Sequence, residues 1–152
     1  MMDRCFNSYA ELWGLFFVDR FAKMAALRFL KAPIDITPFL SLELHFNKGV
    51  SWSLFAQSGW WGSMLVIVAS GSLLCFFAWY INQRRSQGYC TVGEVLVLVG
   101  GTSNFLDRIR YGAVIDYIHF HIGSWSYPIF NIADVLIVVG ITYMIWRPYH
   151  ES

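Results

Sequence analysis

The chain has 152 residues, of which 57% are hydrophobic, 18% are aromatic and only 14% are charged. Soluble domains usually carry about 25% charged residues, so this composition argues against a cytosolic globular protein and favours a chain that folds in a bilayer. The formal net charge is +1 and the sequence has no basic run. We therefore expect no nucleic-acid partner, because nucleic-acid binding needs a stripe of Lys and Arg.

Four stretches are candidates for membrane-spanning helices, which need about 20 mostly apolar residues. They cover residues 11–30, 61–82, 91–107 and 129–146. The second contains no charge, whereas four charged residues interrupt the first, namely Asp19, Arg20, Lys23 and Arg28. Asp19 and Lys23 are four residues apart, so they face the same side of a helix and can pair. We interpret this pair as structural rather than catalytic.

The remaining residues are too few for a separate soluble domain, so residues 1–152 are predicted to form one domain. The connector 83–90 is short and basic, whereas 31–60 and 108–128 are long and rich in aromatic residues. The denser Lys and Arg content favours the short side as cytoplasmic. Polar and apolar residues nearly alternate over 41–49 and 112–122, which predicts two strands. The predicted fold is an all-α membrane protein of four transmembrane helices with a small extracytoplasmic β-sheet.

Two acidic residues lie in apolar sequence, Asp116 in VIDYI and Asp134 in FNIADVLIVV, with Asn131 on the same helical face as Asp134. Ionising a carboxyl at membrane depth costs about 2.5 to 3.5 kcal/mol, so each needs a reason. Two carboxyls brought together there tend to share one proton, which provides a base for water and an acid for a carbonyl, as in aspartic proteases. Spacing leaves an alternative open, in which Asp116 is a turn residue at a strand end and Asp134 caps a helix.

Two further motifs carry polar residues next to the predicted membrane boundary. In NFLDR, Asn104 and Arg108 lie on one helical face with Asp107 adjacent. Arg108 could bind a lipid phosphate or a substrate carbonyl, but spacing alone favours an ion pair with Asp107. In HFNKG, Asn47 precedes Gly49, a combination typical of turns.

Metal and nucleophile motifs have little support. His119 and His121 would project to the same side of a strand, as metal ligands can, but no Cys or carboxylate has matching spacing nearby. The sequence has no GxSxG, HExxH or P-loop motif. We therefore expect neither a metal nor an organic cofactor.

Five blocks of the sequence, in order, resemble the lipoprotein signal peptidases (signal peptidase II) of bacterial inner membranes. The blocks are DRFAK (19–23), FNKGVSWS (46–53), GGTSNFLDR (100–108), VIDYI (114–118) and FNIADV (130–135). Together they are far more specific than any one block. Ser103 and Trp52 depart from the Gly and Phe that are usual in the family. Both are local packing changes, so they bear on the shape of their loops rather than on the chemistry.

The resemblance implies that Asp116 and Asp134 are the catalytic pair. The residues it implies to be supporting or substrate-binding are Asn47, Gly49, Gly100, Asn104, Arg108 and Asn131, with Asp19 and Lys23 as a further buried pair. It implies an aspartic endopeptidase that cleaves lipid-modified prolipoproteins just before a cysteine bearing diacylglycerol. The alternative is a non-catalytic membrane protein that binds lipid or an ion through the same polar bundle.

The resemblance also implies a location. The protein would be a multi-pass protein of the bacterial inner membrane, in contact with membrane phospholipid. Its termini would be cytoplasmic and its active site near the periplasmic face. We expect it to act as a monomer.

Overall fold

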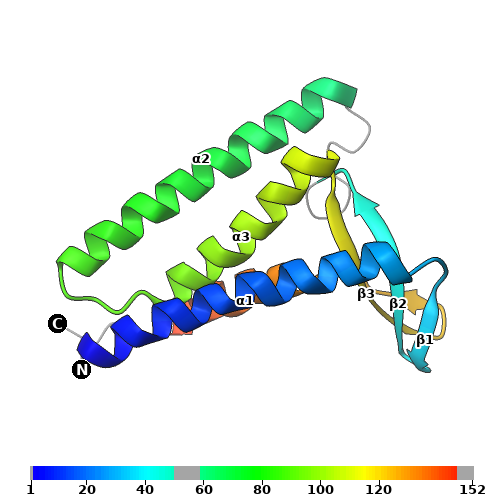
Figure 1. Cartoon of the computed structure of the whole chain (residues 1–152), viewed down its shortest axis with the longest axis horizontal. Coiled ribbons are helices and arrows are strands. Elements are labelled where there is room, and N and C mark those ends of the chain that lie inside the picture. The colour runs from blue at the N-terminus through cyan, green and yellow to red at the C-terminus, as the bar shows by residue number, and fades with distance from the viewer. Residues whose placement is uncertain (1, 50–58, 147–152) are drawn as a thin grey trace.

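The structure is a computed structural model that describes residues 2–49 and 59–146. Within these residues the chain forms four α-helices and four short β-strands. In chain order they are α1 (Met2–Phe29), β1 (Ile34–Thr37), β2 (Leu40–Asn47), α2 (Gly59–Ser86), α3 (Val92–Tyr111), β3 (Val114–Ile122), β4 (Trp125–Ser126) and α4 (Ile132–Trp146). The helices run alongside one another and the sheet lies across one end of them (Figure 1).

Each of the four predicted helical stretches corresponds to a helix of the structure, but the ends of the helices differ from the predicted ends. Helix α1 begins at Met2, well before residue 11, and α3 continues past residue 107 to Tyr111. Gly112 ends α3 in the left-handed conformation, with φ of 69°, and its N–H donates to the carbonyl of Arg108. This is the usual glycine cap of a helix, because glycine has no Cβ to oppose positive φ. Helix α4 begins at Ile132 rather than at residue 129.

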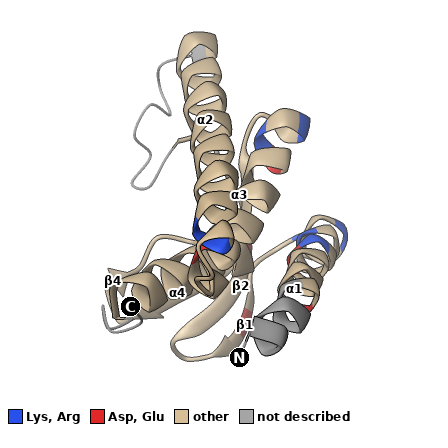
Figure 2. Cartoon of the chain, turned by 90° about the vertical axis from the view of Figure 1, so that its left-hand side faces the viewer, with Lys and Arg blue, Asp and Glu red and all other residues tan. Residues whose placement is uncertain are grey.

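One helix in the described part of the chain is by itself long and apolar enough to cross a membrane, over Trp60–Ser86. Little of it is buried inside the protein, and side chains such as Trp61 (75% exposed) and Phe76 (52%) face outward. Figure 2 shows that the helix carries no charge until the basic residues at its end. Helix α4 is apolar but shorter.

The four strands form one antiparallel sheet in the order β1-β2-β3-β4. The two predicted strands correspond to β2 and β3, whereas β1 and β4 are short and were not predicted. In the register between β2 and β3, His45 lies opposite Asp116. Asp116 is thus an interior strand residue, and its interpretation as a turn residue at a strand end is wrong.

The helices α3 and α4 touch backbone to backbone near the sheet. A methyl group at Gly100 would lie 2.4 Å from the carbonyl oxygen of Ala133. One turn further along α3 from Gly100 is Asn104, and next to Ala133 on α4 is Asp134. The close approach that glycine permits therefore brings these two polar side chains within reach of each other. The apolar core beside this contact comprises Ile81, Val95, Leu96, Val99 and Leu136.

Candidate active site

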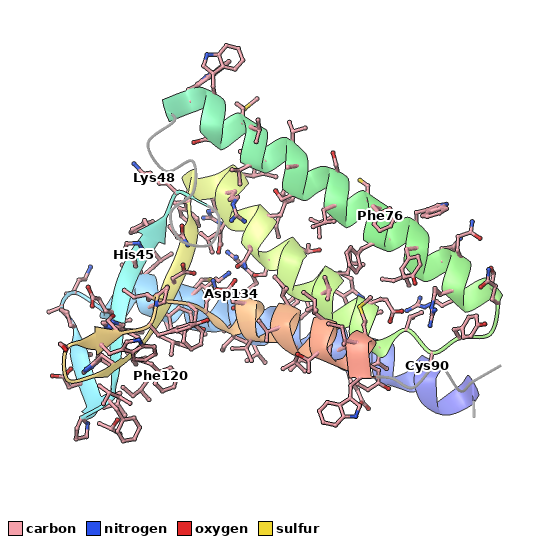
Figure 3. The ribbon with its side chains drawn as sticks, turned by 180° about the vertical axis from the view of Figure 1, so that it is seen from behind. His45, Lys48, Phe76, Cys90, Phe120 and Asp134 are labelled. Atoms are coloured by element: carbon pink, nitrogen blue, oxygen red, sulfur yellow. The ribbon has the colours of Figure 1, made fainter. Side chains whose placement is uncertain are left out.

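Asp134 lies where the helices meet the sheet (Figure 3). The peptide N–H of Asp134 donates to Asn131 Oδ1 at 3.0 Å, and that of Asn131 donates to Asp134 Oδ2 at 3.1 Å. This reciprocal pair is a capping box, in which each side chain satisfies an N–H that the first turn of a helix leaves free. The second carboxylate oxygen, Oδ1, instead accepts a hydrogen bond from Asn104 Nδ2 at 2.8 Å. One carboxylate oxygen of Asp134 therefore completes the capping box of α4, and the other accepts a hydrogen bond from a different helix.

Asp116 is held in the same way, although it comes from a strand. It is 1% exposed. Its Oδ1 accepts from Asn131 Nδ2 at 2.6 Å and its Oδ2 accepts from Asn47 Nδ2 at 3.1 Å. Both carboxyls are thus connected through one asparagine, since the side chain of Asn131 donates to Asp116 and its backbone donates to Asp134.

The orientations of two of these asparagine amides follow from their other contacts. Asn131 Oδ1 accepts from the backbone N–H of Asp134, and Asn47 Oδ1 accepts from the backbone N–H of Gly49 at 3.1 Å. A peptide N–H only donates, so the oxygen of each amide must face it and the NH₂ must face the carboxylate. The predicted turn at Asn47 and Gly49 is therefore present, and its geometry also directs a donor at Asp116.

A cluster of buried charges lies beside these amides. Lys23 Nζ lies 3.0 Å from Asp19 Oδ2 and 2.7 Å from Asp107 Oδ2, and all three side chains are 0% exposed. Arg20 forms a further ion pair with Asp107. Ser103 Oγ donates to Asp19 Oδ2 at 2.5 Å. The predicted pair of Asp19 and Lys23 is confirmed, as one contact of a larger cluster.

Arg20 was predicted only as a charge that interrupts a span, and its place in this cluster was not predicted. Arg20 and Lys23 are three residues apart, so they share a helical face, which is the signal that could have grouped them. Their common partner, Asp107, is 87 residues from Arg20. Ser103, noted only as a departure from the family pattern, also belongs to this cluster. The other departure, Trp52, lies outside the described residues.

The predicted ion pair between Asp107 and Arg108 is wrong. The Asp107 carboxylate binds Arg20 and Lys23 from α1, and its Oδ2 also accepts from the backbone N–H of Ile115 at 3.4 Å. Adjacent residues of a helix point about 100° apart, so Asp107 faces α1 while Arg108 faces elsewhere. Arg108 Nη2 donates to the carbonyl of Gly49 at 3.4 Å, and its buried Nε has no partner in the described part of the chain.

The environment of Asp116 favours its protonated form. Burial, followed by the nearby charge of Asp134, raises the pKa of Asp116 from the usual 3.8 to about 6. The hydrogen bonds from Asn47 and Asn131 and the charge of Lys23 act in the opposite direction. Since burial disfavours the anion while the amides stabilise it, the carboxyl holds its proton close to the pH range in which enzymes use an acid or a base.

The two strand histidines lie apart from this network. The rings of His119 and His121 are 5.2 Å apart, and His119 contacts Ser126 through Nε2 at 2.6 Å and Glu43 through Nδ1 at 3.6 Å. No group of three His, Cys, Asp or Glu residues within 2–49 and 59–146 could hold a metal ion.

The fold is similar to that of solved bacterial membrane enzymes. One such structure aligns with a TM-score of 0.77 and 24% identity over 91% of this chain and 85% of the other. A second aligns with a TM-score of 0.68 and 23% identity over 96% and 95%. A pair of buried carboxyls with fixed donors is typical of sites that carry out general acid–base chemistry. The chain therefore shares the fold of these structures and carries a candidate acid–base site where its helices meet the sheet.

Sequence comparisons identify the family. The chain belongs to the signal peptidase II family, whose sequence model matches residues 12–149. A lipoprotein signal peptidase of Polynucleobacter necessarius is 34% identical over 89% of this chain and 84% of its own length. Lipoprotein signal peptidases of Coxiella burnetii, at 33% over 86% and 85%, and of Burkholderia thailandensis, at 31% over 84% and 78%, are similar relatives.

Proposed function

We propose that the chain is an aspartic endopeptidase that removes signal peptides from diacylglyceryl-modified prolipoproteins and cleaves just before the lipidated cysteine. The relatives that it resembles over most of its length are named lipoprotein signal peptidases. The observation that carries the aspartic mechanism is the network in which Asp116 and Asp134 each accept two N–H donors and share Asn131.

In the proposed reaction the two carboxyls begin with one proton between them. Burial and the charge of Asp134 favour that proton on Asp116, so Asp134 begins as the base. Asp134 takes a proton from water, whose oxygen attacks the carbonyl carbon of the scissile amide, while Asp116 protonates the carbonyl oxygen. The C–N bond of the tetrahedral intermediate then breaks as Asp116 takes back a proton from one of its two hydroxyls, and Asp134 gives the proton from water to the leaving amine, which restores the starting protonation of the pair. The step needs no metal and no organic cofactor.

The donors around the pair would fix the geometry of this reaction. The amides of Asn47, Asn104 and Asn131 leave each carboxylate little freedom to rotate, which keeps the reacting oxygens aligned. Arg108 is not part of the buried charge cluster. In this proposal its N–H groups bind a substrate carbonyl or a lipid phosphate.

We further propose that all four helices cross the bacterial inner membrane, with cytoplasmic termini and the site near the periplasmic face. The start of α1, the end of α4 and the connector after Arg84 and Arg85 lie at the end of the bundle opposite to the sheet (Figure 1). Basic connectors are retained on the cytoplasmic side, which supports this orientation. A substrate anchored by acyl chains would then reach a monomeric enzyme at a fixed depth among the phospholipids.

The test is a cleavage assay with the purified full-length protein in detergent. The substrate is a precursor peptide whose cysteine carries diacylglycerol, and the control is the same peptide without lipid. We expect a new N-terminus at the lipidated cysteine, detected by mass spectrometry, and no cleavage of the unlipidated peptide. A folded protein that binds the lipidated peptide without cleaving it would contradict the proposal and favour a non-catalytic, lipid-binding protein.

A further inference from the structure

Besides its ion pairs, Lys23 forms one hydrogen bond with a neutral side chain. Its Nζ donates to Asn104 Oδ1 at 2.8 Å, in addition to its ion pairs with Asp19 and Asp107. Lys23 is 0% exposed and Asn104 is 6% exposed, so water does not compete for this hydrogen bond. The contact joins the buried charge cluster to an amide that touches Asp134.

This contact determines which way the amide of Asn104 points. The ammonium group of lysine has only donors, so the atom that faces it must be the amide oxygen, and Nδ2 then faces Asp134 Oδ1 at 2.8 Å. In the opposite orientation, the amide oxygen would face a carboxylate oxygen and the NH₂ would face the ammonium. Both contacts would be repulsive, and neither group could turn to water for a partner.

We propose that Lys23 is a positioning residue of the peptidase. It holds the amide of Asn104 so that this amide donates to Asp134, which supports Asp134 as the base of the pair. The proposal rests on the proposed function, because it concerns the base of that reaction. Lys23 does not touch the reacting atoms and acts through Asn104.

Two further contacts influence how much the loss of Lys23 would change the site. Asn131 Nδ2 also approaches Asn104 Oδ1, at 3.2 Å, but its shorter bond is to Asp116 Oδ1 at 2.6 Å, so it supports the orientation only in part. The charge of Lys23 lowers the pKa of Asp116, so removal of the charge alone would also change the pair. An informative experiment must therefore separate the donor of residue 23 from its charge.

Two double variants make that separation. Lys23→Gln with Asp107→Asn and Lys23→Met with Asp107→Asn each remove one cation and one anion from the cluster, so both keep it neutral. Glutamine retains an NH₂ that can reach the amide oxygen of Asn104, whereas methionine has a similar length and no donor. The two proteins therefore differ in one hydrogen bond, and their turnover is compared with the lipidated precursor peptide in detergent.

We expect the methionine protein to have a kcat lower than that of the glutamine protein by about tenfold to a hundredfold, with similar KM, because a misplaced catalytic group slows chemistry without weakening binding. We also expect the alkaline limb of the kcat/KM profile to lie at higher pH in the methionine protein than in the glutamine protein. A turned amide oxygen opposes the anion of the pair, so the shared proton is retained to higher pH. Equal kcat and equal pH profiles in the two proteins would overturn the proposal.

Two single variants cover the case in which the double variants fold poorly. Asn104→Asp keeps an acceptor for Lys23 but, when ionised, has no donor for Asp134, so we expect a comparable loss of kcat, and full activity would overturn the proposal. Arg20→Met removes the other cation of the same cluster, which contacts Asp107 and Ser103. We expect kcat per folded molecule within about threefold of the wild type and an unmoved pH profile. If the wild type itself does not cleave the peptide, the proposed function fails rather than the role of Lys23.

Discussion

The protein contains two pairs of aspartates at the junction of its helices and sheet, and the pairs differ in what surrounds them. Asp19 and Asp107 bind the cations of Lys23 and Arg20. Asp116 and Asp134 accept hydrogen bonds from neutral amides and a backbone N–H, and neither forms a salt bridge with a residue of the described ranges.

The same residue type thus occupies two chemically different environments in one small protein. A buried carboxylate in contact with a cation links the two segments that carry the partners, and removal of one partner is strongly destabilising. A buried carboxylate among neutral donors can gain or lose a proton at moderate cost, which is the property that acid–base catalysis requires. The first pair is therefore interpreted as structural and the second as reactive.

The largest expected effect comes from neutralising the second pair. Asp116→Asn and Asp134→Asn should each lower kcat for the lipidated peptide by about 10⁴-fold or more, because the remaining carboxyl cannot act as both acid and base. Asp35→Asn, on the exposed strand β1, is the matched control and should leave kcat unchanged. Turnover is followed by mass spectrometry on folded protein. If either site variant processed the peptide as fast as the wild type, the interpretation of the second pair as reactive would be wrong.

The next largest effect should be on stability rather than on chemistry. Asp107→Asn leaves Arg20 and Lys23 with one carboxylate between them, and removal of one partner from a buried ion pair costs about 3 to 5 kcal/mol in the free energy of unfolding. We expect kcat per folded molecule to change less than about tenfold. Denaturant unfolding in detergent and turnover are measured on the same samples. A stable protein without activity would mean that the first pair is also reactive.

A change in the close contact between α3 and α4 should lower both the stability and kcat by moderate amounts. In Gly100→Ala the new methyl group meets the carbonyl of Ala133, and overpacking of this kind costs about 1 to 3 kcal/mol. Because Asn104 lies one turn away, the shift of α3 should also lower kcat. Gly14→Ala is the control, since nothing lies within 4 Å of its new methyl group and alanine favours the helix. Equal stability of the two variants would contradict the close packing.

The smallest effect is expected at Ser103, which supports the first pair only. Ser103→Gly removes the hydrogen bond to Asp19 and places glycine inside α3, which should cost about 1 to 2 kcal/mol in the free energy of unfolding. Because Ser103 does not contact the second pair, kcat should be unchanged. Ser103→Ala separates the hydrogen bond from helix propensity. A lower kcat in a fully folded Ser103→Ala protein would show that the two pairs are coupled more tightly than the hydrogen bonds indicate.

Local sequence patterns predicted the elements of this fold that are long or periodic. The four helical stretches were found because each is a run of mostly apolar residues, and the strands β2 and β3 because polar and apolar residues alternate in them. Strands β1 and β4 have four and two residues, which is too short for a period, and they form through pairing with β2 and β3. The start of α4 was placed too early because its boundary depends on the capping box of Asn131 and Asp134.

The candidate site was predictable only where its contacts are local. Spacing by four residues predicted the pair of Asp19 and Lys23, but adjacency in the sequence wrongly paired Asp107 with Arg108. The true partners of Asp107 lie on another helix, and no local pattern contains a contact between residues 87 apart. The meeting of Asp116 and Asp134 at Asn131 is likewise tertiary, and the expectation of a pair came from the resemblance to a family rather than from spacing.

The claim that the second pair holds a shared proton can be tested without any substrate. Burial and the charge of Asp134 raise the pKa of Asp116 to about 6, so its carboxyl should stay protonated well above the usual 3.8. An infrared titration of the full-length protein, with Asp116→Asn as the reference, follows the C=O stretch of a protonated carboxyl. We predict a band that persists above pH 4 and disappears near pH 6 in the wild type, and that is reduced in the variant. A wild-type band that disappears at the usual carboxyl pKa of about 4 would contradict the account.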